Sequence, residues 1–314
     1  MTRSSRNLVV YAALAGNLLV AVTKFVASAI TGSAGMFSEA VHSVVDTGNE
    51  ALLLYGIHRA ARPASPRFPF GQARELYFWS FVVAILIFGV GAGLAFYEGA
   101  ASLAEPRQLE DPLVSYVVLG LAACFEAASW TIAYREFRRS HAGRGFWRAI
   151  ERSKDPRLFL VLLEDSAALV GLAIAFAGVL ADDLTGDPRA DAIASLAIGA
   201  VLAGVAAVLA RECKGLLVGE SADPEIVAGV RRIAAADPRI VRVNDALTMQ
   251  LGPEDILLNL SVDFVDDATA GEVEACIGAM DRRIRAEHGT IRHIFIEAES
   301  VGRVGASSSD QLGR

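Results

Sequence analysis

The sequence is poor in charged residues and has no excess of basic ones. Charged residues make up 21% of the 314 positions, whereas apolar residues make up 53% and the mean hydropathy is +0.41. Such a chain has too few polar groups to cover a soluble surface, which argues against a water-soluble enzyme. The formal net charge is −7, so nucleic acid is not an expected partner.

Cysteine is also scarce. The three cysteines (Cys124, Cys213 and Cys276) include no CxxC pair and lie in unrelated contexts. Neither a disulfide framework nor a thiolate metal cluster is therefore expected, and we interpret all three as packing residues.

Long apolar runs, in contrast, are abundant. A helix that crosses a bilayer needs about 20 mostly apolar residues, because the hydrocarbon core contains no water to satisfy the backbone. Six segments meet this requirement when one or two polar residues are allowed, and the first is too long for a cleavable signal peptide. We predict an all-α membrane domain of six spans within residues 1–210. The segments are 8–30, 33–57, 76–103, 112–134, 158–181 and 190–210.

The basic residues of the first 210 positions predict the orientation of these spans. They gather before the first segment, between the second and third, and between the fourth and fifth, whereas the alternate loops are neutral or acidic. Lys and Arg are retained on the cytoplasmic side of a membrane. We therefore expect both termini in the cytoplasm.

The last third of the chain has the pattern of a small α+β domain. Asp223 and Pro224 begin one helix, and the Thr269 to Glu272 capping box begins another. Between and after them, residues 240–251, 255–264 and 291–296 alternate like strands. The order αββαβ predicts a ferredoxin-like cytoplasmic domain over 211–301, followed by a disordered tail over 302–314.

Ionisable residues within the second segment are candidates for a functional site, because such residues are costly in a membrane. His42 and Asp46 are four residues apart and share one helical face, which Glu39 extends. An imidazole and a carboxylate at this spacing can bind one divalent cation. The alternative is a buried His–Asp hydrogen bond that only ties helices together.

The fifth segment adds two adjacent carboxylates, Glu164 and Asp165. Neighbouring residues of a helix point about 100° apart, so only one of them can easily face the centre of a site. If Asp165 meets His42 and Asp46, the donors are one nitrogen and two carboxylates, with Glu164 or Glu39 as a fourth ligand or a supporting partner. Such donors suit Zn²⁺, and also Co²⁺, Fe²⁺, Ni²⁺ or Mn²⁺.

Other polar residues in the apolar segments have simpler interpretations. We expect Lys24 and Glu126 to lie near span ends and to extend toward water, and Asn17 to bridge two helices. Asp191 is expected to cap the sixth span, and Tyr77 to belong to an aromatic anchor at the membrane surface.

Taken together, these features resemble the cation diffusion facilitator family of zinc transporters, and within it the branch of zinc transporter nine-like proteins. The resemblance rests on the six segments, the αββαβ tail, the His42-Ser-Val-Val-Asp46 motif, the FGQARE and LLEDSAALVG stretches, and Asp191. It implies four ligands, at positions 42, 46, 161 and 165. Val161 cannot bind a metal, so this chain retains three of them.

The resemblance implies a secondary transporter that exports a divalent cation, with Zn²⁺ favoured, from the cytoplasm in exchange for protons. The expected partners are the cation, protons, the lipid bilayer and a second copy of the chain in a homodimer. The expected location is a bacterial plasma membrane. No cofactor is expected and no enzymatic activity. Three alternatives remain: an exporter of Mn²⁺, Fe²⁺, Co²⁺ or Ni²⁺, a scaffold that has lost transport with the ligand at Val161, and an intramembrane hydrolase, for which no HExxH motif is present.

Overall fold

The computed structural model describes residues 18–106, 112–140 and 145–300. It contains two compact units, Met1–Lys214 and Gly215–Arg314, whereas the sequence suggested a boundary after residue 210. The start of the first predicted span, Asn17 and the predicted tail over 302–314 lie outside the described residues.

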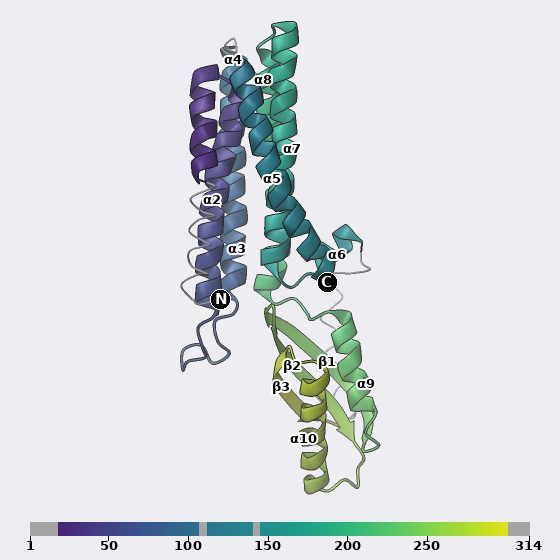
Figure 1. Cartoon of the computed structure of the whole chain (residues 1–314). Helices are drawn as coiled ribbons and strands as arrows, with labels where there is room; N and C mark the ends of the chain where they lie inside the picture. Colours follow the sequence, from purple (N-terminus) through teal and green to yellow (C-terminus); the bar gives the residue numbers. More distant parts are fainter. Residues whose placement is uncertain (1–17, 107–111, 141–144, 301–314) are drawn as a thin grey trace. The chain divides into compact units, whose positions relative to one another are not determined.

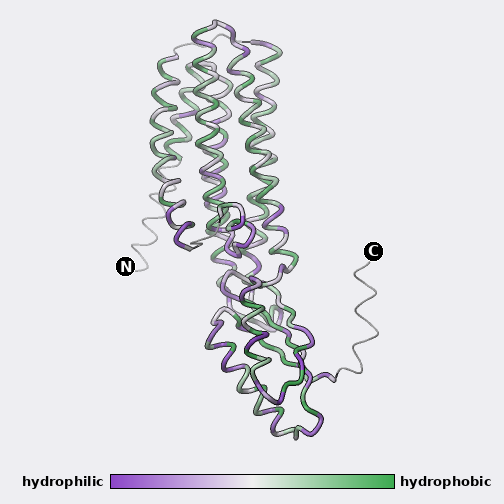
Figure 2. Tube along the Cα trace, turned by 90° about the vertical axis from the view of Figure 1, so that its right-hand side faces the viewer, coloured by the Kyte–Doolittle hydropathy of each residue, from purple (hydrophilic) through white to green (hydrophobic). Residues whose placement is uncertain are grey.

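The first unit is helical throughout its described elements (Figure 1). Helix α2 packs against α3 and α7, and α5 packs along α7. Hydrophobic residues follow these helices along most of their length, as Figure 2 shows. In order, the helices are Leu18–Thr31, α2 (Ala34–Ala60), α3 (Glu75–Leu86), η1 (Ile87–Ala92), α4 (Gly93–Ala104), α5 (Pro112–Ser140), α6 (Phe146–Arg152), α7 (Pro156–Thr185) and α8 (Arg189–Val218).

Four stretches of helix among the described residues are long and apolar enough to cross a membrane. They are Glu75–Ala104, Pro112–Arg139, Pro156–Thr185 and Arg189–Val218. Helix α2 has 27 residues but carries Glu39, Asp46 and Glu50, and the described part of the first predicted span is a shorter apolar helix. The chain is therefore an integral, multi-pass membrane protein.

The third predicted segment forms one continuous helical stretch that is interrupted by a π-helical turn. This turn, η1, lies between α3 and α4 and contains Gly89 and Gly91. At its end the N–H of Gly93 donates to the carbonyl of Phe88, five residues earlier. The extra residue of a π turn is a known local departure from the α-helix, and the apolar composition of the segment gave no sign of it.

Close contacts at small residues hold the helices of the first unit together. Gly99 on α4 lies against Leu196 on α8, and Gly199 on α8 lies against Phe96 on α4. A methyl group at either glycine would collide with its neighbour or press against it. Apolar side chains gain little free energy when they move from lipid into a helix interface, because both surroundings are apolar. Such close packing is therefore a main source of helix association in membranes.

The second unit contains two helices and a three-stranded sheet. Strand β2 pairs antiparallel with β1 and parallel with β3, so that α10 forms the crossover between β2 and β3. The element order is the predicted αββαβ. Alternate residues of β2, from Ile256 to Val262, face a core shared with both helices. The elements are α9 (Pro224–Ala235), β1 (Ile240–Gly252), β2 (Asp255–Phe264), α10 (Ala270–Glu287) and β3 (Ile291–Ala298).

Candidate metal-binding site

The centre of the candidate site is the face of α2 that carries His42 and Asp46. The helix begins where the sequence suggested, since the hydroxyl of Ser33 accepts a hydrogen bond from the N–H of Met36. His42 is 1% exposed and Asp46 is 20% exposed, and the His42 Nδ1 atom lies 3.4 Å from the Asp46 Oδ1 atom. The predicted juxtaposition of nitrogen and carboxylate is present.

Several polar atoms on this helix are buried without a hydrogen bond to any described residue. They are both ring nitrogens of His42, one oxygen each of Glu39 and Asp46, and the amide oxygen of Asn49. Each unsatisfied buried polar group costs about 1–3 kcal/mol. Of these atoms, His42 Nδ1 and Asp46 Oδ1 lie 3.4 Å apart, and unpaired nitrogen and oxygen lone pairs of this kind are what a bound cation requires.

The two adjacent carboxylates of α7 have different surroundings. Glu164 is buried, accepts a hydrogen bond from the Asn49 amide, and interacts directly with the carboxyl group of Asp46. Asp165 is less buried, and it accepts a hydrogen bond of 2.9 Å from the hydroxyl of Ser129 on α5. Asp46 thus lies beside His42 on its own helix and interacts with Glu164 on α7, whereas Asp165 is held against α5.

A buried carboxyl group in contact with a partly buried one favours a proton or a cation between them, because like charges repel strongly where water is scarce. Even so, no three His, Cys, Asp or Glu side chains in the described part of the chain are arranged so that they could hold a metal ion. Cation binding at Asp46 and Glu164 therefore requires the side chains to move closer together.

Glu39 lies on the same helix but has a different partner. Its Oε2 atom is 3.3 Å from the Nζ atom of Lys24, and both side chains are at most 1% exposed. Lys24 also donates a hydrogen bond of 2.8 Å to the hydroxyl of Ser43. The expectation that Lys24 extends toward water is therefore wrong, because this side chain faces α2 instead of the membrane surface.

Asp191 holds the beginning of α2 in place from another helix. Its carboxylate accepts hydrogen bonds from the backbone N–H groups of Ala34 and Gly35 and from the hydroxyl of Ser33. Asp191 was expected to cap its own helix, α8. It stabilises the N-terminus of α2 instead, where the unpaired N–H groups and the helix dipole favour a negative charge.

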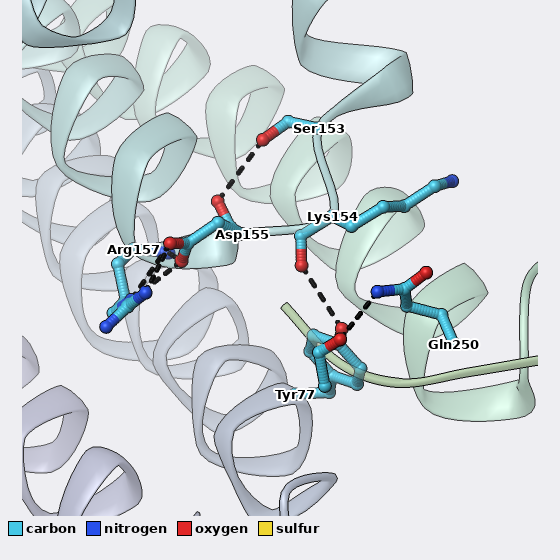
Figure 3. Close-up of polar contacts among 7 residues, drawn as sticks. Tyr77, Ser153, Lys154, Asp155, Arg157 and Gln250 are labelled. Atoms are coloured by element: carbon cyan, nitrogen blue, oxygen red, sulfur yellow. Dashed lines mark hydrogen bonds and ion pairs between the residues drawn. The ribbon is translucent and has the colours of Figure 1, made fainter. Parts of the chain in front are cut away.

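Polar contacts also fix the opposite end of the unit, near the start of α7 (Figure 3). The hydroxyl of Tyr77 on α3 donates to the carbonyl of Lys154 over 3.1 Å, and Tyr77 is fully buried. Asp155 caps α7 and pairs with Arg157. Tyr77 is thus a buried contact between segments, and its interpretation as an anchor at the membrane surface is wrong.

Asn49 is a site residue that the sequence interpretation missed. It lies three residues after Asp46 and seven after His42, so it shares their helical face. The signal was an amide side chain at this spacing within an apolar segment. Ser129 gives no comparable signal, because its role depends on the packing of α5 against α7.

Comparisons with known proteins show where similar sequences occur. Residues 10–218 match the cation efflux transmembrane domain. A Xenopus laevis protein named mitochondrial proton-coupled zinc antiporter SLC30A9 is 35% identical over 82% of this chain and 46% of its own length. Metal tolerance protein C4 of Arabidopsis thaliana is 31% identical over 79% of this chain and 55% of its own length. This chain thus spans about half the length of these two relatives. Magnetosome protein MamB of Magnetospira is 22% identical over 95% of this chain and 97% of its own.

Proposed function

Because this chain belongs to the cation efflux family, a family of membrane cation transporters, we propose that it exports a divalent metal cation from the cytoplasm in exchange for protons. The proposed cargo is Zn²⁺, in keeping with the name of the Xenopus laevis relative. The observation that carries the proposal is the buried imidazole of His42, which has no hydrogen-bond partner among the described residues and lies beside Asp46.

In this proposal the cation binds His42, Asp46 and Glu164. Asp165, which the family position implies, is the other candidate from α7. A metal ligand must lose its proton before it binds, so metal and protons compete for the same atoms. The contact between Asp46 and Glu164 provides a place for a proton when the metal is absent. Release of that proton on metal binding, and its return after metal release, would couple the two fluxes.

We also infer six spans in a plasma membrane, with both termini and the second unit on its cytoplasmic side. Support comes from the four long apolar helices and from the basic residues in the segment between α2 and α3, which are Arg62, Arg67 and Arg74. A homodimer is proposed as well. Large apolar side chains on β1 and β3 are exposed and offer a surface for self-association: Val241, Leu247 and Phe295.

The transport proposal can be tested with the purified full chain in lipid vesicles that contain a zinc-sensitive dye. An imposed pH gradient should drive Zn²⁺ uptake, and the uptake should change direction with the gradient. His42→Ala and Asp46→Asn should abolish it. His58→Ala is the matched control, because His58 is exposed on the same helix and its loss should leave the flux unchanged.

The same vesicles separate the alternatives. A scaffold that has lost transport with the ligand at Val161 would show no flux in the unchanged protein under any gradient. An exporter of another metal would show flux of Mn²⁺, Fe²⁺, Co²⁺ or Ni²⁺ at concentrations at which Zn²⁺ gives none.

A further inference from the structure

A buried ion pair lies beside the candidate metal site and has no part in the transport steps proposed above. Lys24 is fully buried, and it is among the largest side chains in the first unit that are completely enclosed. Its Nζ atom contacts the carboxylate of Glu39 at 3.3 Å and the hydroxyl of Ser43 at 2.8 Å. An ammonium group within a membrane is costly unless it is paired, so its presence there requires an explanation.

The side chain of Glu39 is confined on the side away from Lys24. Its Oε1 atom lies so close to Gly171 on α7 that a Cβ atom at that position would collide with it. The absence of a side chain at Gly171 thus makes room for the carboxylate between α2 and α7. This confinement keeps the Oε2 atom of Glu39 directed at Lys24.

The charge of Lys24 acts on the site itself. Lys24 is close enough to interact electrostatically with His42, Asp46 and Glu126 as well as with Glu39. Interactions between charges are strong where water is excluded. A positive charge at Lys24 therefore opposes the binding of a dication at His42 and Asp46, and the negative charge of Glu39 offsets that opposition.

We propose that Lys24 and Glu39 form a charge-balanced pair beside the His42–Asp46 site, and that the loss of either charge alone shifts the affinity of this site for a divalent metal. In this arrangement Glu39 is the counter-ion of Lys24 and not a metal ligand. Lys24 alone would weaken the binding of the dication and Glu39 alone would tighten it, so the pair holds the affinity between these two extremes. The proposal rests on the proposed transport site and adds to it a pair of residues that tune affinity without touching the metal.

The test measures Zn²⁺ binding to the full chain in detergent by isothermal titration at one fixed pH. Lys24→Gln removes the charge and keeps a hydrogen-bond donor for Ser43, and it should tighten Zn²⁺ binding at least tenfold. Glu39→Gln leaves the ammonium without its counter-ion and should weaken binding at least tenfold. The double variant K24Q/E39Q removes both charges and should return to within about threefold of the unchanged protein.

Two control variants separate this proposal from simpler explanations. Lys24→Arg keeps the positive charge and should bind Zn²⁺ within about threefold of the unchanged protein. His42→Ala removes a proposed ligand. If His42→Ala binds Zn²⁺ normally, the proposed metal site is wrong, whatever the Lys24 and Glu39 variants show.

Opposite shifts of the two single variants, with recovery in the double variant, support the proposal. Shifts in the same direction overturn it, as does the absence of any shift. If Glu39 is a ligand, both E39Q and K24Q/E39Q will bind weakly, which also overturns it. If a single variant fails to fold, the double variant K24Q/E39Q tests the proposal. A loss of Zn²⁺ affinity well beyond threefold in the double variant contradicts charge compensation.

Discussion

Glu164 and Asp165 are consecutive residues of α7, yet one helical step gives their carboxyl groups different partners. Glu164 contacts Asn49 and Asp46 on α2, whereas Asp165 contacts Ser129 on α5. The acidic pair was visible in the sequence, and so was the rule that only one of its members faces the centre of a site. Which member does so depends on the rotation of α7 against α2, and a single sequence carries no direct information on that rotation.

The first prediction compares these two carboxyl groups. On the basis of the contacts, Glu164→Gln should weaken Zn²⁺ binding at least tenfold more than Asp165→Asn, because Glu164 interacts with Asp46 whereas Asp165 is bound to Ser129. Isothermal titration of both variants would measure the difference. The reverse ranking would give the ligand role to Asp165, as the family position implies.

Lys24 and His42 show how far the sequence could predict individual residues. The four-residue spacing from His42 to Asp46 places both side chains on one face of any helix, so their juxtaposition was predictable from the sequence. The partner of Lys24 was not predictable, because Glu39 is 15 residues away on another helix. The prediction of a lysine that extends toward water was based on its own segment alone.

At the scale of elements, Asp191 joins two helices that are far apart in sequence. Its carboxylate on α8 caps the N-terminus of α2. We predict that Asp191→Ala lowers the free energy of unfolding by about 1–2 kcal/mol, the usual cost of a lost N-terminal cap. Thermal unfolding in detergent should show the loss as a lower Tm.

Asp187→Ala is the matched control for this prediction. Asp187 is exposed, and its carboxylate accepts a hydrogen bond from the N–H of Arg189, at the start of its own helix. Its replacement should lower Tm less than the Asp191 variant does. Equal losses would show that the link between α8 and α2 adds nothing to ordinary capping.

The boundaries of elements were harder to predict in the basic stretch between the fourth and fifth spans. Helix α5 continues to Ser140, six residues beyond the predicted end, and α6 (Phe146–Arg152) follows. The sequence was interpreted there as a loop, because Arg and Glu replace apolar residues. Both residue types favour helices once the chain leaves the membrane, so composition marked the end of the apolar run and not the end of the helix.

At the scale of the whole molecule, the second unit has a core of its own, which includes Leu258 and Leu260. We predict that residues 215–300 fold alone and unfold cooperatively in urea. Leu258→Ala, at a fully buried position, should cost about 2–5 kcal/mol. Leu247→Ala, at an exposed position of the same sheet, should cost less than about 1 kcal/mol. Equal costs would mean that this core does not form in the isolated unit.

The acid stability of this unit should depend on Asp237. The guanidinium of Arg239, 2.7 Å away, holds the pKa of the Asp237 carboxyl well below its usual value. A pKa that is lowered on folding contributes stability above the unfolded value of about 4, and this contribution is lost as pH falls toward the folded pKa. Asp237→Asn should therefore cost up to about 1 kcal/mol at pH 7.

The difference between Asp237→Asn and the unchanged unit should shrink as pH falls below about 4. Urea unfolding at pH 7 and pH 3 measures both values. A difference that stays constant between these two conditions would contradict a stabilising role for the charged carboxylate.

Hydropathy and charge both change near residue 210, where the sequence suggested a boundary, and the structure divides into two compact units after Lys214. The order of elements in the second unit followed from local signals, such as the capping box at Thr269 and the alternation along β2. The parallel pairing of β2 with β3 depends on contacts between distant residues, and the local pattern did not specify it.

The π turn between α3 and α4 affects how this span should be aligned and engineered. Because η1 holds one residue more than an α-helical turn would, every side chain from Gly93 onward is rotated by about 100° from the direction that an unbroken helix would give it. A helical wheel drawn straight through residues 75–104 therefore assigns Phe96 and Gly99 to the wrong side. Deletion of one residue within Ile87–Ala92 would therefore restore the regular helix and leave Phe96 and Gly99 facing α8.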